Sequence, residues 1–344
     1  MVSEASAQAP SASASPYPYS HFITGIKFHF NTVRSAAKGS DIWPVTWAAN
    51  NGLYTAWGDG KGFSGTEKVS WGIARLQGKP GHWRGKDVYY GPPGSHKGKI
   101  SGLLAIGNIL YGWENMQNRK FPYCTIALIK STDRGRSWSK TPVSFKRGRF
   151  KPVSFLHYDR GYQGAKHAYV YIAGFKTGDE THSIYLIRVP ENRLEHPEDY
   201  ASFSGMGSDD APLWSNDTSR MRPVFQGVDN KDDIPFPVIV YNKGLASYIL
   251  TDCHGPAGNL GIFEASAPWG PWRTVYYGNH WGGLTQGAYL GFEFPNKWVQ
   301  DHGRRLQMVF SVYDSNKPDW NDACNIMTVT LTTAGGRTGL SKNQ

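Results

Sequence analysis

The sequence predicts an all-β protein built from five similar antiparallel units, and three observations support this fold class. The 344 residues include 40 Gly, 21 Pro, 13 Trp, 19 Tyr and 16 Phe, a composition typical of many short strands joined by turns. Apolar residues do not recur with a sustained period of about 3.6, so long amphipathic helices are not expected. Instead, pairs of short apolar segments separated by turn residues recur at intervals of roughly 45–75 residues.

The first unit is the clearest of the predicted hairpins. Its apolar segments, residues 42–47 and 53–58, are joined by the turn residues Asn50, Asn51 and Gly52. Asn and Gly adopt the positive φ angles of tight hairpin turns at low cost. A turn centred on the two asparagines would place opposite one another residues whose numbers sum to about 100 or 101.

Two carboxylates and two indoles meet at the open end of this hairpin. The predicted register places Asp41 opposite Asp59 or its neighbour, and Trp43 opposite Trp57. Directly opposed positions hold their Cβ atoms roughly 4.5–5.5 Å apart. Like charges held so close raise one of the two pKa values, as a general acid and its partner require.

Four further units repeat this pairing of apolar segments. The paired segments are residues 100–106 and 109–114, 168–174 and 183–189, 236–241 and 247–252, and 287–292 and 306–314. Short antiparallel sheets repeated at this period are the signature of a β-propeller, here with five blades. The apolar segment 23–30 precedes the first unit, so it would complete the last blade and close the ring. A pair of β-sandwiches is the alternative fold.

Two prolines agree with a propeller. Pro44 and Pro237 lie in the first strands of their units. Proline removes a hydrogen bond from a central strand but is tolerated at an edge, and the innermost strand of a blade is an edge that faces the axial channel.

The chain is predicted to form one catalytic domain between two irregular ends. Residues 1–20 are rich in Ser, Ala and Pro and should be disordered, residues 21–332 should form the propeller, and residues 333–344 a flexible tail. The first segment lacks the basic and apolar regions of a signal peptide and is similar to the start of a mature secreted protein. A glycosylation sequon at Asn216 adds to the expectation of secretion, and a cytosolic location stays open.

The cysteines do not indicate a metal site or a disulfide scaffold. Cys124, Cys253 and Cys324 are an odd number without the spacing of a zinc ribbon, so at most one disulfide is expected. No spacing of His, Asp and Glu is typical of a zinc site, and no cofactor is predicted. A structural cation in the axial channel is left open.

The net charge of +10 favours an acidic partner. The chain carries no nucleic-acid-binding motif, and its many Trp and Tyr residues suit sugar rings, so the expected partner is a polysaccharide, with an acidic one favoured by the charge. A solvated basic surface is the alternative interpretation. No apolar run approaches the ~20 residues that span a membrane, so no membrane partner is expected. The chain should be a monomer.

Asp41 and Asp59 are the candidate catalytic residues. One carboxyl group would protonate the glycosidic oxygen, and the other would act as nucleophile or base. Their opposition in a hairpin favours a separation near the ~5 Å of retaining enzymes over the ~6.5–9.5 Å of inverting ones. The alternative is structural, because acids at strand ends commonly accept hydrogen bonds from backbone N–H groups in turns.

Further residues at strand ends and in loops are candidates for substrate binding. An exposed indole would stack on a sugar ring, and an ammonium group would bind a carboxylate, although both residue types also occur in cores and solvated loops. The candidates are Trp43, Trp57, Lys99, Glu114, Arg222, Asp252, His254, Tyr313 and Asp314.

Residues 131–138 match the pattern S-x-D-x-G-x-[ST]-W, the Asp box of sialidase-like propellers. In that motif the aspartate caps a turn between outer strands, and the tryptophan packs between blades. Asp133 is therefore predicted to be structural and is left out of the catalytic site.

Several regions together resemble a group of five-bladed β-propeller proteins that includes the microbial endo-D-arabinanases. They are residues 41–47, 53–60, 259–265 with 268–272, and 294–298 with 308–311. The resemblance implies a propeller that hydrolyses furanosidic bonds through two aspartates of the first blade, which fall on Asp41 and Asp59. The resemblance predicts the substrate of this chain less well than its catalytic residues, because the strong positive charge favours an acidic polysaccharide.

Two other functions stay open. A polysaccharide lyase acting on a uronate-containing glycan, such as a rhamnosyl-glucuronate, would need a base for the C5 proton and a cation at the carboxylate. The residues available for these roles are His96, Lys99, Arg222, His254 and Tyr313. A non-catalytic glycan-binding propeller would keep aromatic stacking without needing the two aspartates.

Overall fold

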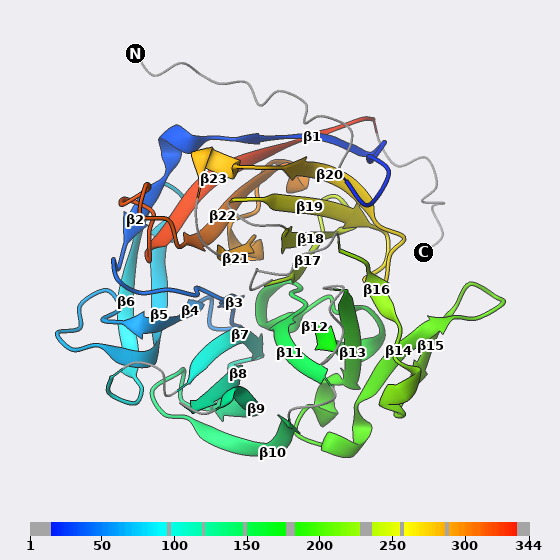
Figure 1. Cartoon of the computed structure of the whole chain (residues 1–344), viewed down its shortest axis with the longest axis horizontal. Coiled ribbons are helices and arrows are strands. Elements are labelled where there is room, and N and C mark those ends of the chain that lie inside the picture. Colours follow the sequence, from blue (N-terminus) through cyan, green and yellow to red (C-terminus); the bar gives the residue numbers. More distant parts are fainter. Residues whose placement is uncertain are drawn as a thin grey trace.

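The computed structural model describes residues 15–94, 98–118, 121–146, 150–176, 183–227, 236–254, 258–285 and 289–335. Within these ranges the chain forms five antiparallel sheets that are arranged in a ring (Figure 1). His96, which the sequence offers as a residue for a lyase, lies outside the described residues.

Each sheet is one blade. The first blade contains β3 (Val45–Trp47), β4 (Leu53–Gly60), β5 (Val69–Lys79) and β6 (His82–Tyr90). The second contains β7 (Lys99–Ile106), β8 (Ile109–Asn118), β9 (Phe121–Ser131) and β10 (Ser139–Lys146). The third contains β11 (Phe150–Phe155), β12 (Tyr169–Lys176), β13 (Ile184–Pro190), β14 (Ala201–Met206) and β15 (Pro212–Ser215), with β16 (Pro223–Phe225) paired to β13.

The remaining two blades complete the ring. The fourth contains β17 (Val238–Asn242), β18 (Ser247–Cys253), β19 (Leu260–Ala265) and β20 (Arg273–Gly278). The fifth contains β21 (Tyr289–Glu293), β22 (Arg305–Val312), β23 (Cys324–Thr333) and β1 (Ile23–Phe28), with β2 (Arg34–Ala36) also paired to β23.

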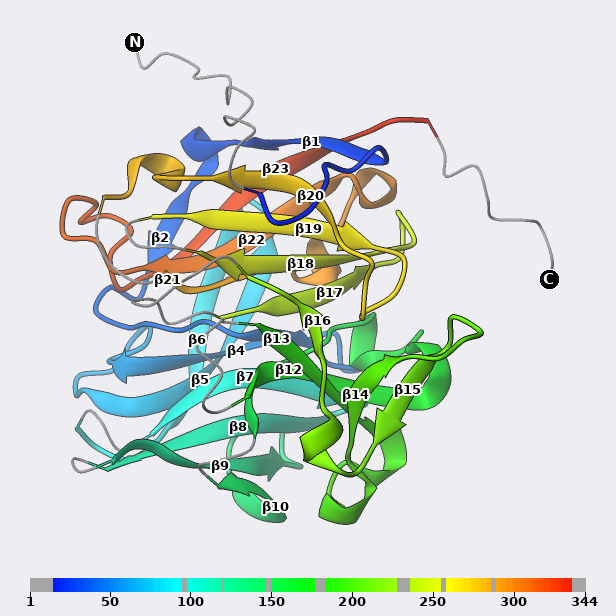
Figure 2. The same cartoon turned by 45° about the vertical axis from the view of Figure 1, so that its right-hand side comes forward.

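These sheets form the five-bladed β-propeller that the sequence predicts. In Figure 1 the strands β3, β7, β11, β17 and β21 lie nearest the centre, and the turned view of Figure 2 shows the blades following one another. A parallel bridge between His157 and Val240 joins the segments of β11 and β17. The inner strands thus begin at one end of the ring, here termed the first mouth, and end at the other, the second mouth.

The N-terminal strand closes the last blade, as predicted. Strand β1 pairs antiparallel with β23 in a register that runs from Ile23 opposite Thr333 to Phe28 opposite Val329. The segment before it is also packed. Tyr17 contacts the Phe225 ring with 5.0 Å between centroids, so ordered structure begins before the predicted boundary at residue 21.

Four of the five predicted hairpins are the first and second strands of a blade. In the third blade the predicted pair, residues 168–174 and 183–189, forms the second and third strands β12 and β13 instead. The inner strand β11 was not predicted, because its sequence follows a basic run and is interrupted by Pro152, where the register to β12 shifts.

The first hairpin has the predicted register near its turn. Val45 pairs with Thr55 and Trp47 with Leu53, and Asn51 has a φ of 62°. Pro44 lies just before β3 rather than within it, and its carbonyl accepts a hydrogen bond from the Ala56 amide at 3.2 Å.

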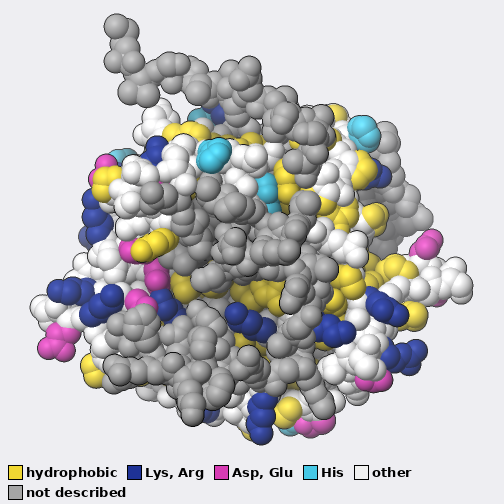
Figure 3. Space-filling model, viewed as in Figure 1, with side chains coloured by type: hydrophobic (Ala, Val, Ile, Leu, Met, Phe, Trp, Pro, Cys, Tyr) yellow, Lys and Arg dark blue, Asp and Glu magenta, His cyan; other side chains and the backbone are white. Residues whose placement is uncertain are grey.

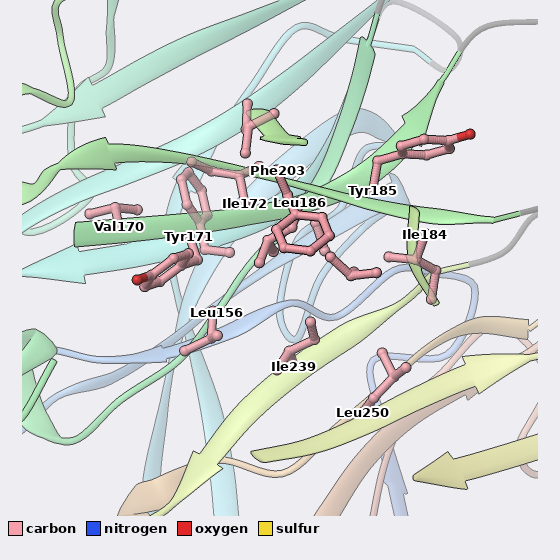
Figure 4. Packing of buried hydrophobic residues seen from close by; sticks show 14 of the residues in the cluster. Leu156, Val170, Tyr171, Ile172, Ile184, Tyr185, Leu186, Phe203, Ile239 and Leu250 are labelled. Atoms are coloured by element: carbon pink, nitrogen blue, oxygen red, sulfur yellow. The ribbon is translucent and has the colours of Figure 1, made fainter. Parts of the chain in front are cut away.

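Apolar side chains from neighbouring blades fill the space between the sheets. Figure 4 shows such a cluster, with Ile172 and Leu186 of the third blade near Ile239 and Leu250 of the fourth. All four side chains are fully buried. This packing between blades fixes the inner strands, and therefore the positions of residues at the mouths.

The described part of the chain has no α-helix, and its helical turns are single 3₁₀ turns. They are η1 (Phe30–Thr32), η2 (Arg160–Tyr162), η3 (Lys166–Ala168), η4 (Glu191–Arg193), η5 (Pro197–Asp199), η6 (Thr218–Arg220), η7 (Trp281–Gly283), η8 (Asn296–Trp298) and η9 (Asp301–Gly303). Among the described residues, none of these is long or apolar enough to cross a membrane.

Asp133 lies in the turn between β9 and β10. Its Oδ1 accepts hydrogen bonds from the Ser131 hydroxyl at 2.8 Å and from the amides of Arg136 and Ser137, and its Oδ2 accepts one from the Ser137 hydroxyl at 2.7 Å. The bonds from Ser137 hold the pKa of Asp133 down to about 2, together with those from Ser131 and Arg136. Asp133 therefore organises this turn.

Cys253 and Cys324 are buried cysteines. The side chain of Cys124 lies outside the described residues.

Candidate active site

Asp41 and Asp59 lie together at the first mouth. Asp41 forms a bridge to Gly58, with its amide donating to the Gly58 carbonyl at 2.9 Å and the reverse bond at 2.6 Å. The partner of Asp41 is thus Gly58, which is next to Asp59 but one residue away from the register predicted from the turn. Ile42 and Asp59 both have positive φ, at 52° and 43°. Such backbone is costly for residues other than Gly, and it concentrates at functional sites.

Lys99, the first residue of β7, joins the two carboxylates. Its Nζ lies 2.8 and 2.7 Å from the two carboxylate oxygens of Asp41 and 3.0 Å from Oδ2 of Asp59. The two Oδ2 atoms are therefore separated by at most the sum of the two Oδ2 distances, about 5.7 Å. This limit applies to one pair of oxygen atoms, and it is compatible with the ~5–5.5 Å between the carboxyl groups of retaining glycosidases.

The three charged groups are largely removed from water. The side chains of Lys99, Asp41 and Asp59 are 10%, 16% and 15% exposed. Burial raises the pKa of Asp41; Lys99 opposes this shift, and the nearby charge of Asp59 adds to it. Burial alone would lower the pKa of Lys99, but the charges and hydrogen bonds of the two aspartates together raise it. The ammonium group is thus held charged.

The site leaves no room for a side chain at Gly58. A Cβ atom there would overlap Oδ1 of Asp41 and the side chain of Lys99. The close approach of these groups therefore depends on glycine at this position.

Asp322 is a third carboxylate near Asp41 and Asp59, and the sequence pattern did not indicate it. Its carbonyl accepts hydrogen bonds from the amides of Gly39 at 2.6 Å and Ser40 at 3.0 Å, which anchors the segment leading to Asp41. Burial raises the pKa of Asp322, and the charge of Asp41 raises it further. Asp322 precedes a third strand, outside the predicted hairpins that supplied the candidate acids. That position explains why the pattern did not reveal it.

Trp43 and Trp57 lie in the core rather than on the surface of the site. They are 3% and 0% exposed, and their rings stack with 6.3 Å between centroids. Neither ring presents a face to solvent, which does not fit the expectation that they stack on a sugar. Their positions agree with the alternative interpretation, in which both tryptophans pack in the core.

Glu114 lies on β8, opposite Ile100 of β7. Its Oε1 accepts a hydrogen bond from the Trp71 indole at 3.2 Å. It is therefore near Lys99, on the neighbouring strand and one register position away, and Trp71 fixes its orientation.

The candidates of the fourth and fifth blades have local roles. The His254 ring stacks on Tyr277 with 3.6 Å between centroids, and burial lowers the pKa of His254 to about 4, against a smaller opposing effect of a backbone hydrogen bond. Asp252 is 5% exposed, at the end of β18. Asp314 accepts hydrogen bonds from the amides of Thr285 at 2.6 Å and Asn316 at 2.8 Å, so it organises its loop.

Tyr313 and Arg222 are exposed and lie apart in the fold. Tyr313 is 60% exposed, next to Asp314. Arg222 precedes β16 on the outer part of the third blade, where its amide donates to the Phe203 carbonyl of β14 at 2.9 Å. The structure thus brings Lys99 to the aspartate pair, leaves Glu114 beside Trp71 on the neighbouring strand, and leaves Arg222 on a different part of the propeller.

The axial channel contains a small cavity of about 20 Å³, lined by residues that include Glu293 and His157. This is room for about one water molecule or ion. Oε2 of Glu293 accepts a hydrogen bond from the Val45 amide at 2.7 Å. Burial raises the pKa of Glu293 to about 8, against the smaller effect of this bond, and burial lowers that of His157 to about 4.

Figure 3 shows Lys and Arg side chains distributed across the face seen there, with hydrophobic surface near its centre.

Comparisons with known proteins agree with this fold. The family model described as "Domain of unknown function (DUF4185)" matches residues 109–325. Among curated proteins, none matches the sequence. Similar solved structures include a GH43_1 enzyme from Xanthomonas citri complexed with xylotriose, at 10% identity and a TM-score of 0.51, covering 91% of this chain and 97% of that one.

Two further structures are similar. The RS223 beta-xylosidase has 12% identity and a TM-score of 0.50, covering 87% of this chain and 94% of that one. A protein of unknown function from Dyadobacter fermentans has 12% identity and a TM-score of 0.50, covering 90% of this chain and 100% of that one. At these identities the comparisons establish the five-bladed architecture, which is shared with glycoside hydrolases.

Proposed function

This chain belongs to the DUF4185 family, and we propose that it is a retaining glycoside hydrolase whose catalytic pair is Asp41 and Asp59. The observation that carries the proposal is the convergence of both carboxylates on the buried ammonium of Lys99. Burying three charged groups at the first mouth costs free energy, and a hairpin does not need such groups to be stable. Such clusters are typical of catalytic sites.

Asp41 is the proposed acid and base, and Asp59 the nucleophile. The raised pKa of Asp41 suits a group that must carry a proton near its working pH. Asp41 would donate that proton to the glycosidic oxygen while a carboxylate oxygen of Asp59 attacks the anomeric carbon and the glycosidic bond breaks. Asp41 would then take a proton from the water that hydrolyses the covalent intermediate.

Lys99 is proposed to hold the carboxylate of Asp59 in position through the contact of 3.0 Å between its Nζ and Oδ2. This assignment disfavours the lyase alternative. A lyase needs a cation free to neutralise the substrate carboxylate, and Lys99 is already engaged by two carboxylates of the protein.

The proposed substrate is a pentose-containing polysaccharide, with arabinan first. The sequence resemblance to endo-D-arabinanases supports this choice, and the two similar structures of a beta-xylosidase and a xylotriose complex agree with a pentose. We also propose that the protein acts outside the cytoplasm as a monomer. The exposure of Asn216, the acceptor of the sequon, supports secretion.

The test incubates the wild type, Asp41→Asn and Asp59→Asn with arabinans, xylan and polygalacturonate. It follows new reducing ends and near-ultraviolet absorbance, which reports unsaturated uronates. We expect reducing ends without absorbance, reduced by about 10²–10⁴-fold in each variant. Asp133→Asn is the matched control, because it makes the same chemical change at a turn of the second blade.

A second measurement separates the two roles. With an aryl glycoside whose leaving group needs no protonation, Asp41→Asn should regain much of its rate in the first step, whereas Asp59→Asn should not. Proton NMR of the first product should show the anomeric configuration of the substrate. Absorbance that persists in both variants would place the protein among lyases, and binding without turnover on the whole panel would favour a glycan-binding propeller.

A further inference from the structure

A groove of about 460 Å³ opens at the second mouth, on the opposite side of the ring from the aspartates. It is formed where inner strands end: Trp47 closes β3, Lys243 follows β17, and Lys297 lies in η8 after β21. Its volume lies within the ~300–1,000 Å³ typical of small-ligand sites.

Cations from three blades line this groove. They are Lys166 in η3 of the third blade, Lys243 of the fourth and Lys297 of the fifth. The acidic residue that also lines the groove is Asp159, which lies 3.7 Å from Lys243 Nζ. After this pairing, Lys166 and Lys297 remain to give the groove a positive potential.

The surroundings of Lys297 favour a bound anion. Its Nζ donates a hydrogen bond to the uncharged carbonyl of Asn51. Burial lowers the pKa of Lys297, and the nearby charge of Arg75 lowers it further. An anion placed beside Lys297 would relieve both the loss of solvation and the repulsion between the two cations.

Aromatic rings form another part of the groove. Trp47 and Tyr241 line it and are both partly exposed, in contrast to the buried Trp43 and Trp57. Lys166 Nζ lies over the Tyr241 ring, 4.6 Å from its centroid.

Amide side chains complete the lining. Gln163 and Asn296 line the same groove. Aromatic faces bind the apolar faces of sugar rings, and amide groups bind hydroxyls.

We propose that this groove is a second carbohydrate site, distinct from the aspartate pair, which binds an anionic oligosaccharide through Lys166 and Lys297 with a sugar ring against Trp47 or Tyr241. The anionic group would be a carboxylate or a sulfate, which share the chemistry that two ammonium groups recognise. The site would hold a charged region of a polysaccharide while another part of the chain reaches the first mouth. Its binding does not depend on catalysis by Asp41 and Asp59.

The test is isothermal titration calorimetry of the full-length protein with an oligogalacturonate, a sulfated heparin hexasaccharide and a neutral xylo-oligosaccharide. The wild type should bind at least one of the two anionic sugars and bind the neutral one more weakly, with affinity falling as salt increases. The double variant Lys166→Gln/Lys297→Gln should lose at least about tenfold in affinity for the anionic sugar. The sugar that binds more tightly identifies the anionic group.

The control removes the same charge elsewhere. Lys79→Gln/Lys86→Gln changes the last residue of β5 and a residue of β6, the outermost strand of the first blade, and both side chains are exposed. It should bind like the wild type. Equal affinities of the groove variant and this control would overturn the proposal, and so would equal binding of neutral and anionic sugars.

A further variant locates the anion. Loss of binding in Lys99→Gln, with binding kept in the groove variant, would place the anion at the first mouth and refute a second site. If the double variant unfolds, Lys166→Gln alone and Trp47→Phe test the same groove with smaller changes, and both should weaken binding of the anionic sugar.

Discussion

Glu293 in the axial cavity should make the stability of the propeller depend on pH. Its pKa is raised from the ordinary 4.5 to about 8, mainly by burial. A carboxyl group with a raised pKa stabilises the fold while it is protonated, so its full contribution is present below pH 4.5 and is lost as the pH rises through about 8. Glu293→Gln keeps an acceptor for the Val45 amide but cannot ionise.

The magnitude follows from the displacement of the pKa. Each pH unit corresponds to about 1.4 kcal/mol, so moving the pKa from 4.5 to about 8 corresponds to a loss of about 5 kcal/mol once the group is fully ionised. The variant should therefore be more stable than the wild type above pH 8, by up to about 5 kcal/mol, and nearly equal to it near pH 4.5.

Urea unfolding at pH 4.5, 6.5 and 8.5, followed by tryptophan fluorescence, measures this difference. The control is Glu198→Gln, the same chemical change at a side chain that is 63% exposed, and it should change stability by less than about 0.5 kcal/mol at any pH. A difference between Glu293→Gln and wild type that stays constant from pH 4.5 to 8.5 would refute the argument. It would mean that Glu293 titrates near its ordinary pKa in the folded protein.

Further predictions concern the first mouth and the turn in the second blade. Lys99→Met removes the cation that lowers the pKa of Asp41, so the pKa of Asp41 should rise further and the variant should lose stability from pH 5 to pH 8 relative to wild type, as urea unfolding would show; a pH-independent loss would contradict this. Gly58→Ala should lower kcat/KM while circular dichroism stays native, since its Cβ would displace Asp41 and Lys99; unchanged kinetics would contradict the site geometry. Asp133→Ala should cost about 1–2 kcal/mol of unfolding free energy with kcat/KM intact, because it removes turn hydrogen bonds only.

The sequence was most informative where a single turn determines the geometry. The asparagine turn sets the register between β3 and β4, and a shift of one residue before β3 then places Asp41 opposite Gly58, next to Asp59. The convergence of both aspartates could therefore be anticipated from local chemistry. The positive φ of Asp59 could not, because it belongs to a departure from regular strand geometry that no local residue pattern indicates.

Other features depend on contacts between blades, which sequence spacing does not encode. Lys99 was identified as a candidate, but its position between the aspartates arises from the packing of β7 against the first blade. The sequence did not decide whether Trp57 is buried or exposed. Alternation along a strand does not tell which face of the sheet packs against the next blade. In the sequence, residues 294–298 carried only the family resemblance, yet they follow an inner strand and place Lys297 at the second mouth.

The pairing of β1 with β23 has a consequence for how the protein folds. The fifth sheet needs residues 23–28 and residues 324–333, so on the ribosome it cannot be completed until nearly the whole chain has been made. The first four blades can form in order as the chain lengthens, while the N-terminal strand stays unpaired with an exposed edge. Closure of the ring is then a late step between segments at the two ends of the chain, and such non-local pairing forms slowly.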